Sequence, residues 1–223
     1  MRKNFPLLSV FVFIQSFVFV QNLSAQGLLR MRDVLAQMPD SVVPLMTRVN
    51  RLDCIDFIEN DMPARVRNVV DEYVELEALT PDYMRLRTSE ATLLEARLLT
   101  LTDSTQQLCV ISTVEVRADS LLFQDSQLHV CDTTWHPLAI VSPYALPTVE
   151  QWLTQPIPDE DILARLALQS LRTFHPLAMH FTAGVDTLSV TLQLSQLTAS
   201  ERNALQPYLP ANLTRSVELS LRK

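Results

Sequence analysis

The sequence predicts an α+β fold: N-terminal helices, then an antiparallel β-sheet meander, then a second β segment with an inserted helix. Three observations support this order. Apolar residues recur at helical spacing within 26–62, alternate with polar residues over much of 63–138, and alternate again within 177–223. Between the last two segments, 139–176 is a Pro-rich connection that also holds a helical pattern. Helices followed by strands in this way are typical of α+β proteins.

The segment 26–62 is predicted to be helical, because apolar side chains recur at helical spacing from Leu28 to Met38. Ser41 could cap a short second helix, and Asn50 is a suitable N-cap for a third. Three carboxylates of that third helix would share one face: Asp53, Asp56 and Glu59. Such a face is usually solvated, although paired acids can also perform acid–base chemistry.

The clearest strand signal lies between Tyr83 and Asp132, where four or five apolar runs are separated by short polar breaks. One run alternates strictly, with these residues on one face: Leu108, Val110, Ser112, Val114 and Val116. Asp and Ser in the breaks favour turns, because their side chains bond to nearby backbone. The preceding segment, 64–79, is rich in β-branched residues and is predicted as strand, with a helix as the alternative.

A further helix is predicted over 159–174, where four large apolar residues could share one face: Ile162, Leu163, Leu166 and Leu171. The segment 177–223 then follows as β-β-α-β. Its first two strands alternate strictly, and a capping box of Thr198 and Glu201 opens its helix. The sequence leaves open whether the two β segments form one sheet or two, and whether 26–223 is one domain.

Composition excludes several kinds of site. Apolar residues make up 48% of the chain, which is enough for a packed core. There are only two glycines, so Gly-rich phosphate loops, dinucleotide fingerprints and nucleophile elbows cannot be present in standard form. The formal charge is −7 and the only lysines are Lys3 and Lys223, which argues against nucleic acid or anionic membranes as partners. No cofactor is predicted.

The first 25 residues resemble a secretory signal peptide. Arg2 and Lys3 precede an apolar run from Phe5 to Val20, and Ala25 is a suitable small residue before the cleavage point. An uncleaved anchor is the alternative, but the run is short for a bilayer span. We therefore expect an exported protein of the periplasm or cell surface, with no membrane span after the signal is removed.

A cluster of potential metal ligands lies near the end of the meander. His129, Asp132 and His136, together with Cys131, fall within eight positions, and residues of these types bind metals. A polar sheet edge followed by a turn is the alternative. No second paired cluster completes a four-ligand site, so these three residues are candidates only.

The chain has three cysteines, which is an odd number for an exported protein. Cys109 and Cys131 fall in the same meander and could form a disulfide across two strands. A hairpin about Arg117–Ser120 would place position 109 opposite 128, so the bond would require a bulge near Gln124. Cys54 is expected to be a buried small residue.

Three short blocks resemble the signature of an uncharacterised family of exported Bacteroidales proteins, known as a domain of unknown function. They are Met38-Pro39-Asp40-Ser41 with Pro44, Asn50-Arg51-Leu52-Asp53 and Asp56-Phe57; Leu79-Thr80-Pro81-Asp82-Tyr83; and Asp132-Thr133-Thr134-Trp135-His136-Pro137-Leu138. A Gly-rich turn that the family often has is replaced by Val70-Asp71-Glu72. The resemblance implies a Gram-negative envelope address and brings no activity, cofactor or catalytic residue.

The same resemblance implies a modification. Exported proteins of such bacteria are O-glycosylated at Asp-Ser or Asp-Thr pairs, and we expect this at the exposed turns of Ser104 and Thr187. Such pairs are also common in ordinary turns and caps.

These observations favour a non-enzymatic envelope protein that binds or interacts with a partner, either an unknown envelope protein or an apolar small molecule. One alternative is a hydrolase or metalloenzyme centred on His129, Asp132 and His136. Another is a periplasmic carrier that holds an apolar ligand between the faces of its sheets. No catalytic residue is predicted from a motif.

Overall fold

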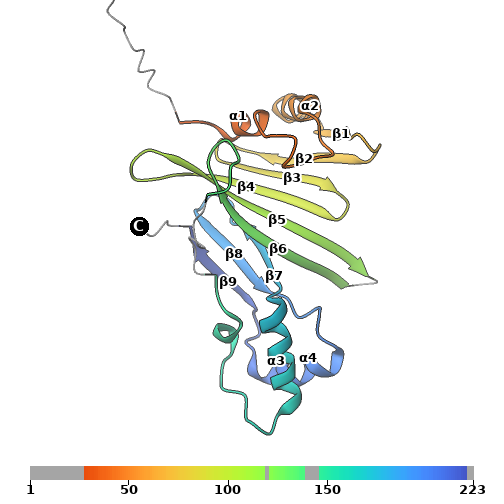
Figure 1. Ribbon diagram of the computed structural model, residues 1–223, viewed down its shortest axis with the longest axis vertical. Helices are drawn as coiled ribbons and strands as arrows, with labels where there is room; N and C mark the ends of the chain where they lie inside the picture. The colour runs from red at the N-terminus through yellow and green to blue at the C-terminus, as the bar shows by residue number, and fades with distance from the viewer. Residues whose placement is uncertain (1–27, 119–120, 139–145, 220–223) are drawn as a thin grey trace, which may run out of the picture.

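The computed structural model describes residues 28–118, 121–138 and 146–219, and it confirms the α+β class (Figure 1). The strands are β1 (Arg65–Arg67), β2 (Tyr73–Leu79), β3 (Tyr83–Ser89), β4 (Thr92–Thr100), β5 (Gln106–Ala118), β6 (Leu121–Cys131), β7 (Leu177–Phe181), β8 (Thr187–Leu192) and β9 (Thr214–Glu218). The helices are α1 (Met31–Ala36), α2 (Arg48–Glu59), α3 (Ile162–Phe174) and α4 (Ala199–Leu205), with 3-10 turns η1 (Val149–Trp152) and η2 (Gln206–Tyr208). The predicted signal peptide, 1–25, lies outside the described residues.

The strands form two separate antiparallel sheets. β1 to β6 follow one another in order in the large sheet, and β7 to β9 form the small sheet. Figure 1 shows the large sheet in the upper part of the molecule, with α1 and α2 beside β1 and β2, and the small sheet below it with α3 and α4. In the part of the chain that is described, no helix is long and apolar enough to cross a membrane.

The first hydrophobic core lies between α1, α2 and one face of the large sheet. Met31, Val34 and Leu35 of α1 are fully buried there, as are Cys54 and Ile55 of α2. The sheet contributes alternate residues of its strands: Val74, Leu76, Met84, Leu86, Leu94, Ala96, Leu98, Leu108 and Val110. Burial of each such aliphatic side chain stabilises the fold by roughly 1.5–3 kcal/mol.

The N-cap of α2 lies three residues before Asn50, the predicted N-cap. Thr47 is the N-cap, and its hydroxyl accepts from the Asn50 backbone N–H at 3.2 Å while the Asn50 side chain accepts from the Thr47 N–H at 3.1 Å. Both residues are good caps, but a capping box needs the second residue three positions inside the helix.

The predicted short helix after Ser41 is replaced by a series of turns over 40–45. A buried arginine organises these turns. The Arg51 guanidinium donates to the Met46 carbonyl at 2.9 Å and contacts an Asp40 oxygen at 2.8 Å. Because a buried guanidinium needs such partners, the chain before α2 is bent around Arg51 instead of forming a helix.

Two further contacts fasten α1 to the large sheet. The Met31 N–H donates to the Pro81 carbonyl at 2.8 Å, and the Trp135 indole N–H donates to the Val34 carbonyl at 2.9 Å. Trp135 has a positive φ of 69°, which is rare for a bulky residue and turns its ring toward α1. Both contacts involve residues of the short blocks that resemble a known family.

The second core lies on the opposite face of the large sheet. There Leu99, Cys109, Ile111 and Val130 pack with the apolar face of the small sheet and with the buried sides of α3 and α4. The small sheet contributes Leu177, Met179, Phe181, Leu188, Val190 and Leu192. The apolar faces of the two sheets therefore share one packed interior.

Candidate functional site

The predicted metal ligands near the end of β6 belong to a tight turn. One Asp132 oxygen accepts from the Thr134 N–H at 2.8 Å, the Thr134 hydroxyl at 2.6 Å and the His136 N–H at 3.0 Å. The hydrogen bond from the Thr134 side chain, with help from these backbone groups, lowers the pKa of Asp132. Asp132 thus shapes the turn that presents Trp135 to α1.

Of the three predicted ligands, Asp132 and His136 lie next to each other, with 3.7 Å between Asp132 Oδ2 and His136 Nδ1. His129 lies on β6 opposite Val110 and is exposed, and the His136 side chain is 78% exposed. Among the described residues, no group of three or more His, Cys, Asp and Glu side chains is arranged to hold a metal ion. The described side chains therefore lend no support to the hydrolase or metalloenzyme alternative, which stays a prediction.

The disulfide predicted between Cys109 and Cys131 does not fit the observed register. Cys109 lies opposite Val130 and Cys131 lies opposite Leu108, with no bulge between β5 and β6. Because side chains alternate along a strand, Cys109 points into the second core and Cys131 into the first. Cys54 is buried as expected, and burial raises the pKa of its thiol to about 12.

The two predicted glycosylation positions differ in their surroundings. Ser104 is exposed in the turn between β4 and β5, with a positive φ of 65°. Thr187 is half-buried at the start of β8, and its carbonyl accepts from the Thr182 N–H at 3.0 Å. Ser104 is therefore the more accessible of the two, and modification at either residue remains a prediction.

The carboxylates of α2 form a solvated helix face. Asp53, Asp56 and Glu59 are all exposed. Glu59 pairs with Arg32 of α1 at 2.9 Å. These carboxylates therefore form the ordinary solvated helix face that the sequence analysis favoured over acid–base chemistry.

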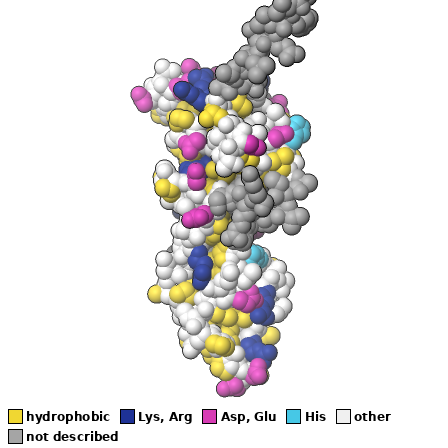
Figure 2. Space-filling view, turned by 90° about the vertical axis from the view of Figure 1, so that its left-hand side faces the viewer, with side chains coloured by type: hydrophobic (Ala, Val, Ile, Leu, Met, Phe, Trp, Pro, Cys, Tyr) yellow, Lys and Arg dark blue, Asp and Glu magenta, His cyan; other side chains and the backbone are white. Residues whose placement is uncertain are grey.

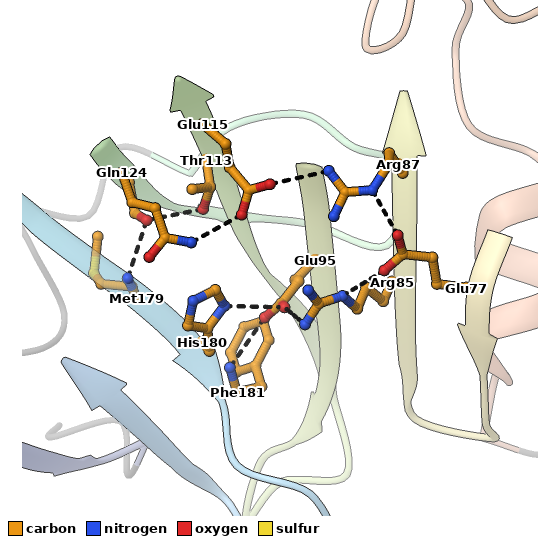
Figure 3. Close-up of polar contacts among 11 residues, drawn as sticks. Glu77, Arg85, Arg87, Glu95, Thr113, Glu115, Gln124, Met179, His180 and Phe181 are labelled. Carbon is orange, nitrogen blue, oxygen red and sulfur yellow. Dashed lines mark hydrogen bonds and ion pairs between the residues drawn. The ribbon is translucent and has the colours of Figure 1, made fainter. Parts of the chain in front are cut away.

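A network of charged side chains that no sequence motif indicated crosses the second face of the large sheet (Figure 3). Glu77 sits at the bulge between β2 and β3, where it contacts Arg85 at 2.7 Å and Arg87 at 2.6 Å. Arg87 continues to Glu115 of β5 at 3.0 Å. Burial alone would raise the pKa of Glu115, but hydrogen bonds from Gln124 and Arg87 outweigh it and lower that pKa.

Glu95 of β4 is the buried centre of this network, with 1% of the residue exposed. It accepts from Arg85 at 2.9 Å and from the backbone N–H of Phe181 at 3.1 Å, and the His180 ring lies 3.3 Å away. Beside it, the Ser126 hydroxyl accepts from the Met179 N–H at 3.0 Å. These two side chains supply acceptors to the outer edge of β7, so they dock the small sheet on the large one.

This network is suited to structure rather than to catalysis. A catalytic acid must contact its substrate, and Glu95 is enclosed and already accepts from backbone and arginine donors. Sequence offered one signal that was missed. Glu95 and Arg97 interrupt a strand that is buried on both faces, where a charge requires a partner.

Several large apolar side chains of α3 are exposed. Of the four residues predicted to share an apolar face, only Leu171 is buried. The other three, with Phe174, are exposed: Ile162 at 68%, Leu163 at 41%, Leu166 at 56% and Phe174 at 66%. Ala164, Ala167, Leu168 and Leu171 form the buried face instead, because the alanines allow close packing against the core.

We call the exposed side chains Ile162, Leu163, Leu166 and Phe174 the α3 face. Ser170 and Thr173 lie between them, so no charged residue interrupts this side of the helix. A solvent-facing helix side normally carries charged residues. Figure 2 shows apolar side chains at the surface of the lower part of the molecule, with arginines and acidic residues beside them.

A shallow groove of about 530 Å³ runs along one flank of the α3 face. Leu153, Ile157 and Leu166 supply apolar walls. Two arginines at its rim are held by acids of the same chain, Arg165 by Asp159 at 2.7 Å and Arg172 by Glu150 at 2.5 Å. The groove and the α3 face together are the candidate interaction surface.

The chain was compared with family models, curated proteins and solved structures. A family model described as "Protein of unknown function (DUF3256)" matches residues 20–216. The chain is similar to a solved domain of an uncharacterized protein from Porphyromonas gingivalis W83, with 21% identity and a TM-score of 0.68, over 85% of this chain and 93% of that one. No curated protein matches the chain. The resemblance carried by the three short blocks is thereby confirmed, and the chain belongs to the DUF3256 family of proteins of unknown function.

Proposed function

We propose that this protein is an exported, non-enzymatic interaction module of the cell envelope, and that it docks a protein partner through the α3 face. The observation that carries the proposal is the exposure of four large apolar side chains on one short helix. Contiguous apolar patches of this kind on a soluble domain mark sites of association. The flanking groove and its arginines provide the polar rim that such interfaces have.

The proposed location in the cell envelope rests on the N-terminal sequence. The charged start, the apolar run and the small residues before position 26 have the order of a secretory signal. Detection of the processed chain in the periplasmic or surface fraction supports this address. Recovery of the chain in the cytosol with its first residues intact would refute it.

A protein partner suits the fold better than an apolar small molecule. A carrier would need space between the apolar faces of its two sheets. Here Ile111 and Val130 of the large sheet pack with Met179 and Val190 of the small sheet in one core. The open side of α3 offers exposed apolar side chains outside this core.

Site-specific photo-crosslinking in cells tests the docking surface. A photoreactive amino acid at position 166 should give a discrete adduct, because Leu166 lies at the centre of the α3 face. Asp56 is exposed on α2, away from the α3 face and its groove, so the same amino acid at position 56 is the control and should give a weaker adduct. Equal adducts from both positions, or none from position 166, would refute the α3 face as a docking site.

A second variant distinguishes specific docking from a chance contact with a neighbouring protein. Leu166→Glu should remove the adduct formed by a photoreactive group at position 174, since a carboxylate would be buried without a partner on docking. Because Leu166 is exposed, the substitution should leave the fold intact, as circular dichroism would verify. An unchanged adduct would refute the proposal.

A further inference from the structure

The two edges of the small sheet differ in how their backbone groups are satisfied. Beyond the ends of the β8–β9 ladder, the Leu192 N–H donates to the Leu213 carbonyl at 3.1 Å and the Leu219 N–H to the Asp186 carbonyl at 2.9 Å. In an antiparallel pair, alternate residues bond to the neighbouring strand. The odd-numbered residues of β9 therefore bond to β8, and Thr214, Ser216 and Glu218 turn their backbone groups outward.

The outer edge of β7 is closed by side chains. The N–H groups of Met179 and Phe181 point away from β8, and Ser126 and Glu95 of the large sheet accept from them. A sheet edge that is capped in this way cannot pair with another strand. The other edge of the small sheet is β9.

The described residues leave most of the outer edge of β9 without partners. The Thr214 N–H is accepted by the Asn212 side chain at 2.9 Å. Within the described ranges, no backbone or side-chain group accepts from the N–H groups of Ser216 and Glu218. All three outward residues are exposed to solvent. Unpaired groups along a strand edge are a template for another strand.

We propose that β9 pairs antiparallel with β9 of a second copy of this chain, with Ser216 on the two-fold axis. In this register Ser216 exchanges both backbone hydrogen bonds with Ser216 of the other copy. The Glu218 N–H then donates to the Thr214 carbonyl of that copy. The two small sheets become one continuous sheet through an isologous interface.

The side chains of β9 are compatible with this register. Thr214 lies opposite Glu218 of the other copy and Arg215 lies opposite Val217, so no like charges face each other across the axis. The Arg215 guanidinium is held by its own subunit, where it lies 5.6 Å from the centre of the Trp152 ring and donates to the Gln151 carbonyl. The β1 edge of the large sheet is different from β9, because β1 has only three residues and two of them are arginines.

Sedimentation velocity of the purified chain over a range of concentrations is the first test. We expect a concentration-dependent monomer–dimer equilibrium. Ser216→Lys should weaken association at least tenfold, because it places two ammonium groups together on the axis. Ser189→Lys is the matched control, since Ser189 lies directly opposite Ser216 on β8 and on the same face, but away from the axis. It should associate like the wild type.

Cysteine substitution tests the register itself. Two Ser216→Cys chains would place their Cα atoms about 5.5 Å apart, within the range of a disulfide, so oxidised glutathione should link them. Thr214→Cys would place its two Cα atoms about 14 Å apart along the strands and should give no dimer. An equimolar mixture of Thr214→Cys and Glu218→Cys chains should link again.

The outcomes separate clearly. Linkage at 216, and between 214 and 218, supports the two-fold pairing. A wild-type monomer at every concentration, together with no faster linkage at 216 than at 214, overturns it. Because β9 and the α3 face are different surfaces, the result leaves the docking proposal for α3 unaffected.

Discussion

Substitution of Glu95 probes how the small sheet is held on the large one. Glu95→Ala removes the acceptor of the buried Phe181 N–H and the enclosed partner of Arg85. Removal of one partner from a buried charge pair costs about 3–5 kcal/mol, and an orphaned buried N–H accounts for about 1–3 kcal/mol of such a loss. The free energy of unfolding should therefore fall by about 4 kcal/mol. Glu95→Gln keeps one oxygen as an acceptor and should lose less.

Urea denaturation followed by circular dichroism measures this loss, and a thermal scan should show a fall in Tm of about 10 °C. Glu77→Ala is the control, because Glu77 pairs with the same Arg85 but is 26% exposed at its side chain. A partly exposed pair contributes only about 1 kcal/mol or less. If Glu95→Ala loses no more stability than Glu77→Ala, the buried acid does not fasten the two sheets.

Three further predictions follow from burial and charge. The pKa of Glu115 is lowered in the folded state, so its pairing stabilises the protein above the unfolded pKa of about 4.3 and is lost as the pH falls through the lower folded value. The stability gap between wild type and Glu115→Gln should thus be constant from pH 7 to 5 and should close in acid; a gap that widens in acid would contradict this sign. Leu171→Ala should cost about 2–5 kcal/mol because Leu171 is buried, and Leu166→Ala should cost about 0.5 kcal/mol or less, as denaturation will show. Cys54 should resist iodoacetamide at pH 8 until the protein unfolds, and rapid labelling of the native protein would refute its burial.

Local sequence signals predicted the elements of this fold well. Strict alternation predicted β5, β7 and β8, and the capping box of Thr198 and Glu201 opens α4 as predicted. These signals act within one element, so they can be recognised without knowledge of the rest of the chain. The start of α2 was placed too late because Thr47 and Asn50 are both good caps.

Features that depend on strand register were not predictable in the same way. Each of Arg85, Arg87 and Glu115 reads as an ordinary solvent-facing residue of an alternating strand. Only the pairing of β2 to β5 brings them into one network, and the bulge at Glu77 directs its carboxylate between two arginines. The same dependence explains the error over Cys109, since a shift of one residue moves a side chain to the other face.

The orientation of α3 could not be predicted from apolar spacing alone. Apolar spacing predicted one face for Ile162, Leu163, Leu166 and Leu171, but spacing cannot say which side of an apolar helix meets the core. The small residue Ala164 decides this, because it allows the helix to approach the core closely. The three larger residues are then left outside, where they form the proposed docking surface.

The contacts of the recognisable sequence blocks have a consequence for the family as a whole. Asp40 with Arg51 joins the turns before α2 to that helix, whereas Pro81 with Met31 and Trp135 with Val34 hold α1 on the large sheet, so each block lies at a joint between elements. Relatives that keep these joints inherit the same architecture, whatever they bind. The two proposed interaction surfaces, on α3 and β9, lie outside these blocks, so their residues can vary without loosening the joints.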